Sequence, residues 1–200
     1  MVRDMTDRIL SVCVYCGSRD GSEPAYAAAA AAVGACIGQL GWRLVYGGGR
    51  AGLMGRVADA ALASGAQVVG VIPQSLVERE LGHPGLHELH VVETMHQRKQ
   101  LMAERADAFL ALPGGIGTFE ELFEVWTWRQ LGYHDKPVGL LNVEGYYDAL
   151  VRFLDQTEQR GFVSASQRAL LQVDDAPPRL LQRLGELARE ATAPDDYRRI

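Results

Sequence analysis

The sequence contains few lysines, although it is not poor in basic residues. Only Lys99 and Lys136 are lysines among the 20 Lys and Arg residues. A pyridoxal enzyme needs a lysine to form its Schiff base. Lys136 directly precedes Pro137 in a polar turn, which is a poor place for a buried reactive lysine. The scarcity of lysine therefore argues against pyridoxal chemistry.

Excess positive charge and long apolar segments are also lacking. The formal net charge is -5, which argues against a nucleic acid or a membrane surface as partner, because both require a basic face. No apolar run approaches the roughly 18 residues that a membrane span needs. Residues 1–8 are polar and lead into a strand, unlike a signal peptide. We therefore expect a cytoplasmic protein that binds a small molecule locally.

Cysteine is scarce as well. Of the three cysteines, Cys13 and Cys16 form a C-x-x-C pair, a spacing found in redox pairs and in halves of zinc sites. No second pair completes a zinc site, and Cys13 lies in an apolar run, where cysteine is commonly buried. We favour a structural role for the pair, and we expect neither a metal nor a cofactor.

Apolar runs alternate with helical patterns along the whole chain. The 200 residues, 48% of them hydrophobic, fit one globular domain over residues 1–200, with a polar tail from about residue 191 that should fray. Strands are predicted near 9–15, 42–46, 67–72, 88–92, 108–112 and 137–142. Helices are predicted near 24–40, 51–64, 94–106, 118–131, 146–160 and 177–190. This alternation predicts an α/β protein with a Rossmann-like, doubly wound parallel sheet, which binds ligands at the carboxyl ends of its strands.

A glycine turn between a strand and a helix is the strongest local signal. Residues 113–121 read PGGIGTFEE and follow the apolar run 108–112. The first amide groups of a helix lack intrahelical acceptors, so such a turn can bind phosphate. Glu120 and Glu121 stand within one helical turn of this seat. Thr118 and Glu121 also fit a T-x-x-E capping box, so a structural and a functional interpretation of Glu121 both remain open.

A second glycine loop covers residues 47–55, which read GGGRAGLMG. Gly47, Gly49 and Gly52 match the G-x-G-x-x-G fingerprint of dinucleotide sites. The next strand, however, ends in residues 71–75 without the acidic residue that holds the ribose in NAD enzymes. A tight turn without ligand and a mononucleotide site shared with residues 113–118 are the alternatives, and we favour the second.

Arg98 interrupts an apolar stripe. On the predicted helix 94–106, Met95 and Met102 lie three residues before and four residues after Arg98, which places all three on one face. A charge that faces inward needs an acidic partner or an anionic ligand. Lys99 is a second candidate for the same crevice.

Three segments together resemble a known family. They are VYGGG with GLMG at 45–49 and 52–55, MHQRK at 95–99, and PGGIGT at 113–118 followed by Glu121, which matches P-G-G-x-G-T-x-x-E. With CGS at 16–18 and DKPVGLLN at 135–142, they are similar to the Lonely Guy family, the cytokinin riboside 5′-monophosphate phosphoribohydrolases. The likeness runs from about residue 9 to residue 162. Members have also been labelled lysine decarboxylases, which the scarcity of lysine disfavours.

The resemblance implies a homodimeric hydrolase without a cofactor. Such an enzyme cleaves the N-glycosidic bond of an N6-substituted adenosine 5′-monophosphate, or of AMP, to release the free base and ribose 5-phosphate. It places the catalytic pair at Arg98 and Glu121. Substrate contacts fall on Glu80, Arg98, Lys99, Gly114, Gly115, Ile116, Gly117, Thr118, Phe119, Glu120 and Thr127, with further loop contacts at Ser18, Gly48 and Gly49.

The chemistry of the residues agrees with this resemblance. Cleavage of the bond builds positive charge on the ribose, and a carboxylate one ribose away from the phosphate seat would stabilise it. Arg98 could anchor the phosphate or orient the leaving base. The alternative is a non-catalytic nucleotide-binding or cofactor-carrier module, which would need the glycines but not Glu121 or Arg98. Helix 118–131 is apolar around more of its circumference than one sheet face covers, which favours a dimer.

Overall fold

The computed structural model describes residues 9–80 and 82–197, without the side chains of residues 78–80. They form a seven-stranded parallel sheet in the order β4-β3-β2-β1-β5-β6-β7. Its strands are β1 (Ser11–Tyr15), β2 (Arg43–Tyr46), β3 (Gln67–Pro73), β4 (Glu88–Val92), β5 (Ala108–Ala111), β6 (Val138–Leu141) and β7 (Leu171–Asp174). The predicted doubly wound α/β fold is confirmed.

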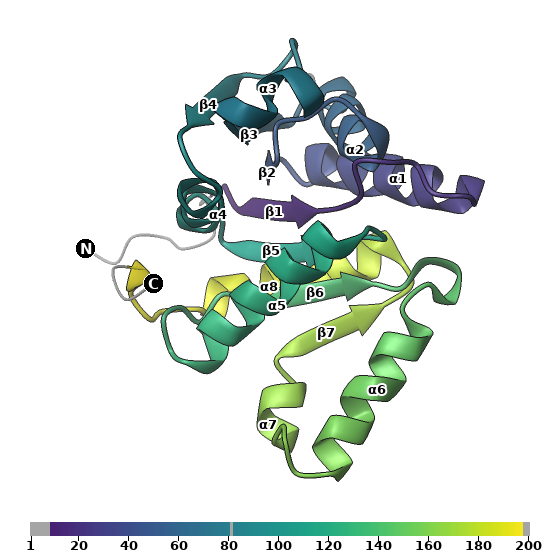
Figure 1. The fold of residues 1–200 in the computed structure, drawn as a ribbon, viewed down its shortest axis with the longest axis vertical. Coiled ribbons are helices and arrows are strands. Elements are labelled where there is room, and N and C mark those ends of the chain that lie inside the picture. Colours follow the sequence, from purple (N-terminus) through teal and green to yellow (C-terminus); the bar gives the residue numbers. More distant parts are fainter. Residues whose placement is uncertain (1–8, 81, 198–200) are drawn as a thin grey trace.

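Helices connect the strands and cover both faces of the sheet. They are α1 (Pro24–Gln39), α2 (Gly52–Ala63), α3 (Gln74–Glu80), α4 (Met95–Glu104), α5 (Ile116–Gln130), α6 (Asp148–Gln159), α7 (Ala165–Arg168) and α8 (Pro177–Glu190), with a 3-10 turn η2 (Val143–Gly145) before α6. Figure 1 shows β1 and β5 side by side in the middle of the sheet, with α4 and α5 beside them. Within the described part of the chain, no helix is long and apolar enough to cross a membrane.

Alternate side chains of the strands enter two separate cores, because successive residues of a strand point to opposite faces. Val12 and Val14 of β1 pack with residues of α1, α2 and α8 on one face. Cys13 and Tyr15 pack with residues of α4, α5 and α6 on the other. Five of the six predicted strands, β1, β2, β3, β5 and β6, lie inside the sheet and are largely buried, which explains their continuous apolar runs, whereas β4 is an edge strand and is mostly exposed.

Some short elements differ from the prediction. The elements β7, α3 and α7 were not predicted, since segments of four to seven residues carry too little periodicity to be recognised. Helix α5 begins at Ile116 rather than Thr118, because Gly115 in extended conformation is its N-cap.

The expectation of a frayed tail from about residue 191 is wrong for residues 191–197. Tyr197 is buried and packs edge-on against Trp128, with ring centroids 5.8 Å apart. The amides of Thr192 and Ala193 both donate to Asp135 Oδ2 at 2.8 Å. A polar segment thus docks through one buried aromatic ring and through hydrogen bonds, which an apolar pattern does not reveal.

Candidate active site

A cavity lies where the chain order of the sheet reverses. Strand β1 pairs with β2 on one side and with β5 on the other. The loops that follow β1 and β5 therefore diverge, and open α/β sheets bind their ligands at such a point. The cavity has a volume of about 640 Å³ and is lined by residues of both loops, of α4 and of the first turn of α5.

The glycine turn after β5 forms one wall. The N-cap of α5 is Gly115, which offers no side-chain cap, so the amides of Ile116, Gly117 and Thr118 are available to an anion. A Cβ atom on Gly114 would overlap the Thr118 hydroxyl, so only glycine fits there. The turn has the geometry of a phosphate seat that opens into the cavity.

The capping-box interpretation of Thr118 and Glu121 is wrong. Thr118 is the third residue of α5 rather than its N-cap, and it is buried beneath Gly114. Glu121 is half-buried and lines the cavity. Burial raises the pKa of the Cys16 thiol, and the negative charge of Glu121 raises that pKa further. Since Cys16 follows β1 and also lines the cavity, the carboxylate lies near the carboxyl end of β1.

Arg98 is held by the ends of two strands. Its side chain is buried, Nε donates to Val71 O at 3.0 Å, and Nη2 donates to Gly47 O at 2.7 Å. A Cβ atom on Gly47 would overlap the guanidinium group, so the second glycine loop makes room for this arginine. A capping box of Thr94 and Gln97 fixes the start of α4. Arg98 also lines the cavity.

Lys99 turns toward α5 rather than into the cavity. Its Nζ lies 2.5 Å from Glu120 Oε1 and 2.9 Å from Glu124 Oε1. Burial lowers the pKa of Lys99, but the two carboxylates outweigh burial, and the net shift is upward. Desolvation raises the pKa of Glu124, although Lys99 opposes that shift. Lys99 therefore ties α4 to α5 and stands behind Glu120, which does line the cavity.

The structure gathers most of the predicted site residues around this cavity. Those that line it are Ser18, Arg98, Gly114, Gly115, Ile116, Gly117, Thr118, Glu120 and Glu121. Five others lie elsewhere, namely Gly48, Gly49, Lys99, Phe119 and Thr127. The side chain of Glu80, at the end of α3, is outside the described residues.

Sequence reasoning missed much of the remaining lining. Leu53, Met54, Leu76 and Met95 give the cavity an apolar side, and Tyr26 and Tyr146 add aromatic rings. These residues come from elements far apart in the sequence, and no local pattern marks them. The cavity thus combines an anion seat, a carboxylate and an arginine with apolar space suited to a base.

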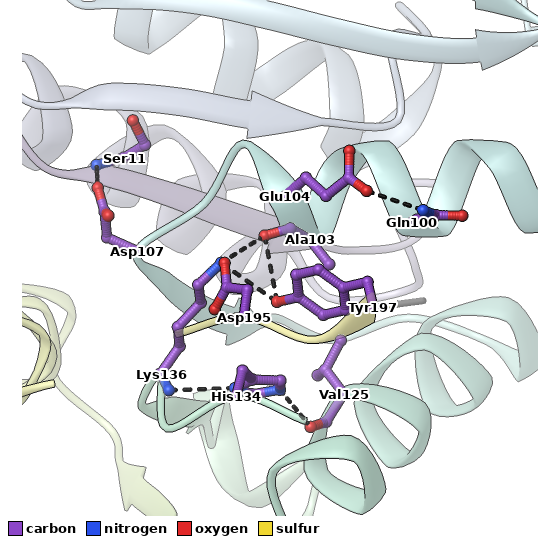
Figure 2. Close-up of polar contacts among 10 residues, drawn as sticks. All are labelled: Ser11, Gln100, Ala103, Glu104, Asp107, Val125, His134, Lys136, Asp195 and Tyr197. Carbon is purple, nitrogen blue, oxygen red and sulfur yellow. Dashed lines mark hydrogen bonds and ion pairs between the residues drawn. The ribbon is translucent and has the colours of Figure 1, made fainter. Parts of the chain in front are cut away.

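Lys136 lies at the opposite edge of the sheet, before β6, and the expectation of an exposed polar turn is wrong. The side chain is buried, and its Nζ lies 2.6 Å from Asp195 Oδ2. Nζ also donates to Ala103 O at 2.9 Å and to Tyr197 Oη at 3.1 Å, as Figure 2 shows. The docked tail supplies two of these partners, which is why the sequence suggested exposure. Lys136 remains unsuited to Schiff-base chemistry, because it is paired and remote from the cavity.

Comparisons with known proteins agree on the family. A family model described as "Possible lysine decarboxylase" matches residues 54–184. A cytokinin riboside 5′-monophosphate phosphoribohydrolase of Arabidopsis thaliana is 47% identical over 185 residues, which cover 92% of this chain and 87% of that protein. A second enzyme of that name from the same plant is 48% identical over 177 residues, covering 88% and 82%. The solved molybdenum cofactor carrier protein of Chlamydomonas reinhardtii shares 19% identity at a TM-score of 0.69, covering 90% of this chain and 98% of that one, and it shows the fold alone.

Proposed function

Because the chain belongs to the family of the cytokinin riboside 5′-monophosphate phosphoribohydrolases, we propose that its cavity hydrolyses the N-glycosidic bond of N6-substituted adenosine 5′-monophosphates. The products are the free base and ribose 5-phosphate. One observation carries the proposal: the uncapped start of α5, Glu121 and Arg98 all line the same cavity of about 640 Å³.

In this proposal, each wall of the cavity binds a different part of the substrate. The 5′-phosphate binds the amides of Ile116, Gly117 and Thr118 at the positive end of the α5 dipole. The ribose then lies beside Glu121, one turn further along α5, whose carboxylate stabilises the positive charge that develops at C1′. Water is the acceptor of the glycosyl group.

The position of the Arg98 guanidinium is fixed by the chain, whereas the part of the substrate that it contacts is open. Its bonds to Val71 O and Gly47 O hold the guanidinium at the ends of β2 and β3. From there it neutralises the phosphate or assists the departing base. The apolar side chains of Leu76 and Met95 offer a surface for the base and its N6 substituent. Contacts from Glu80, Lys99, Phe119 and Thr127 stay predictions.

A direct assay separates a hydrolase from a carrier. The protein is incubated with AMP and with isopentenyladenosine 5′-monophosphate, and the free base is measured by chromatography. We expect base release from both nucleotides and none with Arg98→Ala. Tight nucleotide binding without base release by the wild type would favour the carrier module on this fold.

We also propose that the enzyme is a homodimer in which α5 takes part. Four apolar residues of α5, Leu122, Val125, Trp126 and Trp128, are buried within the chain. The apolar excess of the helix is therefore smaller than its sequence suggests. Phe123 remains exposed at 36%, and Leu131, the C-cap of α5, at 56%; we assign both to the partner surface.

Light scattering at micromolar concentration tests the dimer. We expect about twice the chain mass of 21.8 kDa, and a shift toward monomer in Phe123→Glu. Phe162→Glu is the matched control, because Phe162 is exposed at 85% and lies outside α5. A fully active protein of monomer mass would contradict the proposal.

A further inference from the structure

The backbone of the glycine turn is tied down before α5 begins. The carbonyl of Leu112 accepts a hydrogen bond from Tyr147 Oη at 2.7 Å. The next carbonyl, that of Pro113, accepts from the amide of Gly17 at 3.1 Å. Two different segments thus hold two consecutive carbonyls of the turn.

A third consecutive carbonyl is held by a side chain that lines the cavity. Tyr146 Oη donates to Gly114 O at 2.6 Å. The Tyr146 ring is itself fixed edge-on by Tyr147, with centroids 4.8 Å apart, and by Tyr26 at 5.5 Å. The hydroxyl is therefore presented by a ring that has contacts on two sides, although Tyr146 is 39% exposed.

Holding this carbonyl fixes the amide that follows. In a planar trans peptide the C=O of Gly114 and the N–H of Gly115 point in opposite directions. Gly115 is also the N-cap of α5, so this peptide leads directly into the three amides that would meet an anion. Both residues are glycines, whose backbones have more conformational freedom than those of other residues, so a hydrogen bond to this carbonyl restricts the peptide.

The backbone of the segment that carries Tyr146 is strained, and hydrogen bonds from a neighbouring side chain stabilise it. Glu144 has φ 49° and ψ 32°, a left-handed conformation that is costly for a residue with a Cβ. Asn142 stabilises the segment, because its Oδ1 accepts from the Tyr147 amide and its Nδ2 donates to Asp148 Oδ1, both at 2.7 Å. Such strain persists at sites where the surroundings dictate one geometry, often for function.

We propose that Tyr146 is a positioning residue for the phosphate seat, which its hydroxyl pre-organises through the Gly114 carbonyl. The inference rests on the proposed function, which places the phosphate at the start of α5. Tyr146 itself takes no part in bond cleavage.

Adjacent tyrosines provide a matched pair of variants. Tyr146→Phe removes the bond to Gly114 O and keeps the ring, whereas Tyr147→Phe removes the bond to Leu112 O from a side chain that is 2% exposed. Four quantities are measured for each variant: the Tm, the KM and the kcat for AMP, and the affinity for ribose 5-phosphate by calorimetry. Adenine serves as the ligand without phosphate.

The two variants should change different quantities: Tyr146→Phe the phosphate affinity, and Tyr147→Phe mainly the Tm. For Tyr146→Phe we expect the KM for AMP and the Kd for ribose 5-phosphate to rise together by about fivefold, the effect of one orienting hydrogen bond. Its adenine affinity and Tm should stay near wild type. For Tyr147→Phe we expect the larger loss of Tm, about 3 °C, and the smaller change in phosphate affinity.

Two results would overturn the positioning role. One is an unchanged Kd of Tyr146→Phe for ribose 5-phosphate, with or without a loss of Tm. The other is an equal loss of affinity for adenine, which would place Tyr146 against the base. Failure of the wild type to release base would refute the proposed function instead, and the calorimetric comparison with ribose 5-phosphate would still decide the role of Tyr146.

Discussion

Buried basic residues have different roles at the two ends of the parallel strands, which we call the carboxyl edge and the amino edge of the sheet. At the carboxyl edge, Arg98 lines a cavity of about 640 Å³ beside the uncapped start of α5. At the amino edge, Lys136 lines a space of about 160 Å³ together with Asp107, Asp135 and Asp195. Each of these three carboxylates bonds to an amide or to Lys136 within the chain.

The comparison shows that burial of a charge does not by itself mark an active site. The amino edge satisfies its charges with its own side chains and with the docked tail, so it contributes to stability. At the carboxyl edge, the uncapped start of α5 and Glu121 line a cavity, and helix N-terminal amides of this kind can bind an anion. Changes at one edge should therefore affect turnover, and changes at the other should affect unfolding.

The largest expected effect is at the carboxyl edge. Glu121→Gln keeps the size of the side chain but removes the charge that faces the oxocarbenium ion, so kcat should fall about a hundredfold or more. Steady-state kinetics with AMP measures the fall, and the melting temperature reports on folding. Base release close to the wild-type rate would leave Glu121 without a catalytic role.

At the amino edge, His134 should make stability depend on pH. The ring accepts from the Lys136 amide at Nδ1, so Nε2 carries the proton and donates to Val125 O at 2.9 Å (Figure 2). Burial lowers the pKa of His134 to about 4, and the positive charge of Lys136 contributes to this shift. In the unfolded chain the pKa is about 6.5.

The sign follows from proton linkage. Below pH 6.5 the unfolded state binds a proton that folded His134 does not, so stability is full above about pH 6.5 and is lost as the pH falls toward 4. The loss amounts to about 3 kcal/mol. His134→Gln can keep both hydrogen bonds without titrating, so the difference between the two unfolding curves isolates this group. Parallel curves for the two proteins between pH 7 and pH 4 would contradict the assignment.

Much of the carboxyl edge was predictable because its signals are local. The glycine turn at 113–118 and the inward position of Arg98 each follow from a short local pattern. Tyr26, Leu76 and Tyr146 were not predictable, since each comes from a different element and only the fold brings them to the cavity.

The amino edge escaped sequence reasoning for a related reason. Lys136 and Tyr197 are 61 residues apart, and each looks like a surface residue in its own segment. Their burial depends on the tertiary contact between them, which no pattern in either segment predicts. Similarly, the short outermost strand β7 forms because it pairs with β6, and its own four residues do not predict it.

Removal of the Lys136 ammonium should test the stability role of the amino edge. Lys136→Met keeps the apolar stem but removes the ammonium that donates to Ala103 O and Tyr197 Oη and pairs with Asp195. We expect unfolding free energy to fall by about 2 kcal/mol, with kcat and KM per folded molecule near wild type. Denaturant titration measures the first and AMP kinetics the second. A selective loss of kcat would show that this edge influences catalysis and would break the comparison.

The smallest effect should come from the acidic partner of the same lysine. Asp195 is the more solvated member of the pair, with its side chain 32% exposed against 9% for Lys136. In Asp195→Asn the Lys136 ammonium still donates to Ala103 O and Tyr197 Oη, and water can reach it from the side of residue 195. The loss of unfolding free energy should therefore stay below about 1 kcal/mol. The loss should shrink only slightly in high salt, because the Lys136 end of the pair is buried and salt screens such a pair less than an exposed one. Denaturant titrations at low and high salt measure both quantities. A loss equal to that of Lys136→Met would mean that the ion pair, rather than the hydrogen bonds to Ala103 and Tyr197, holds the tail against the amino edge.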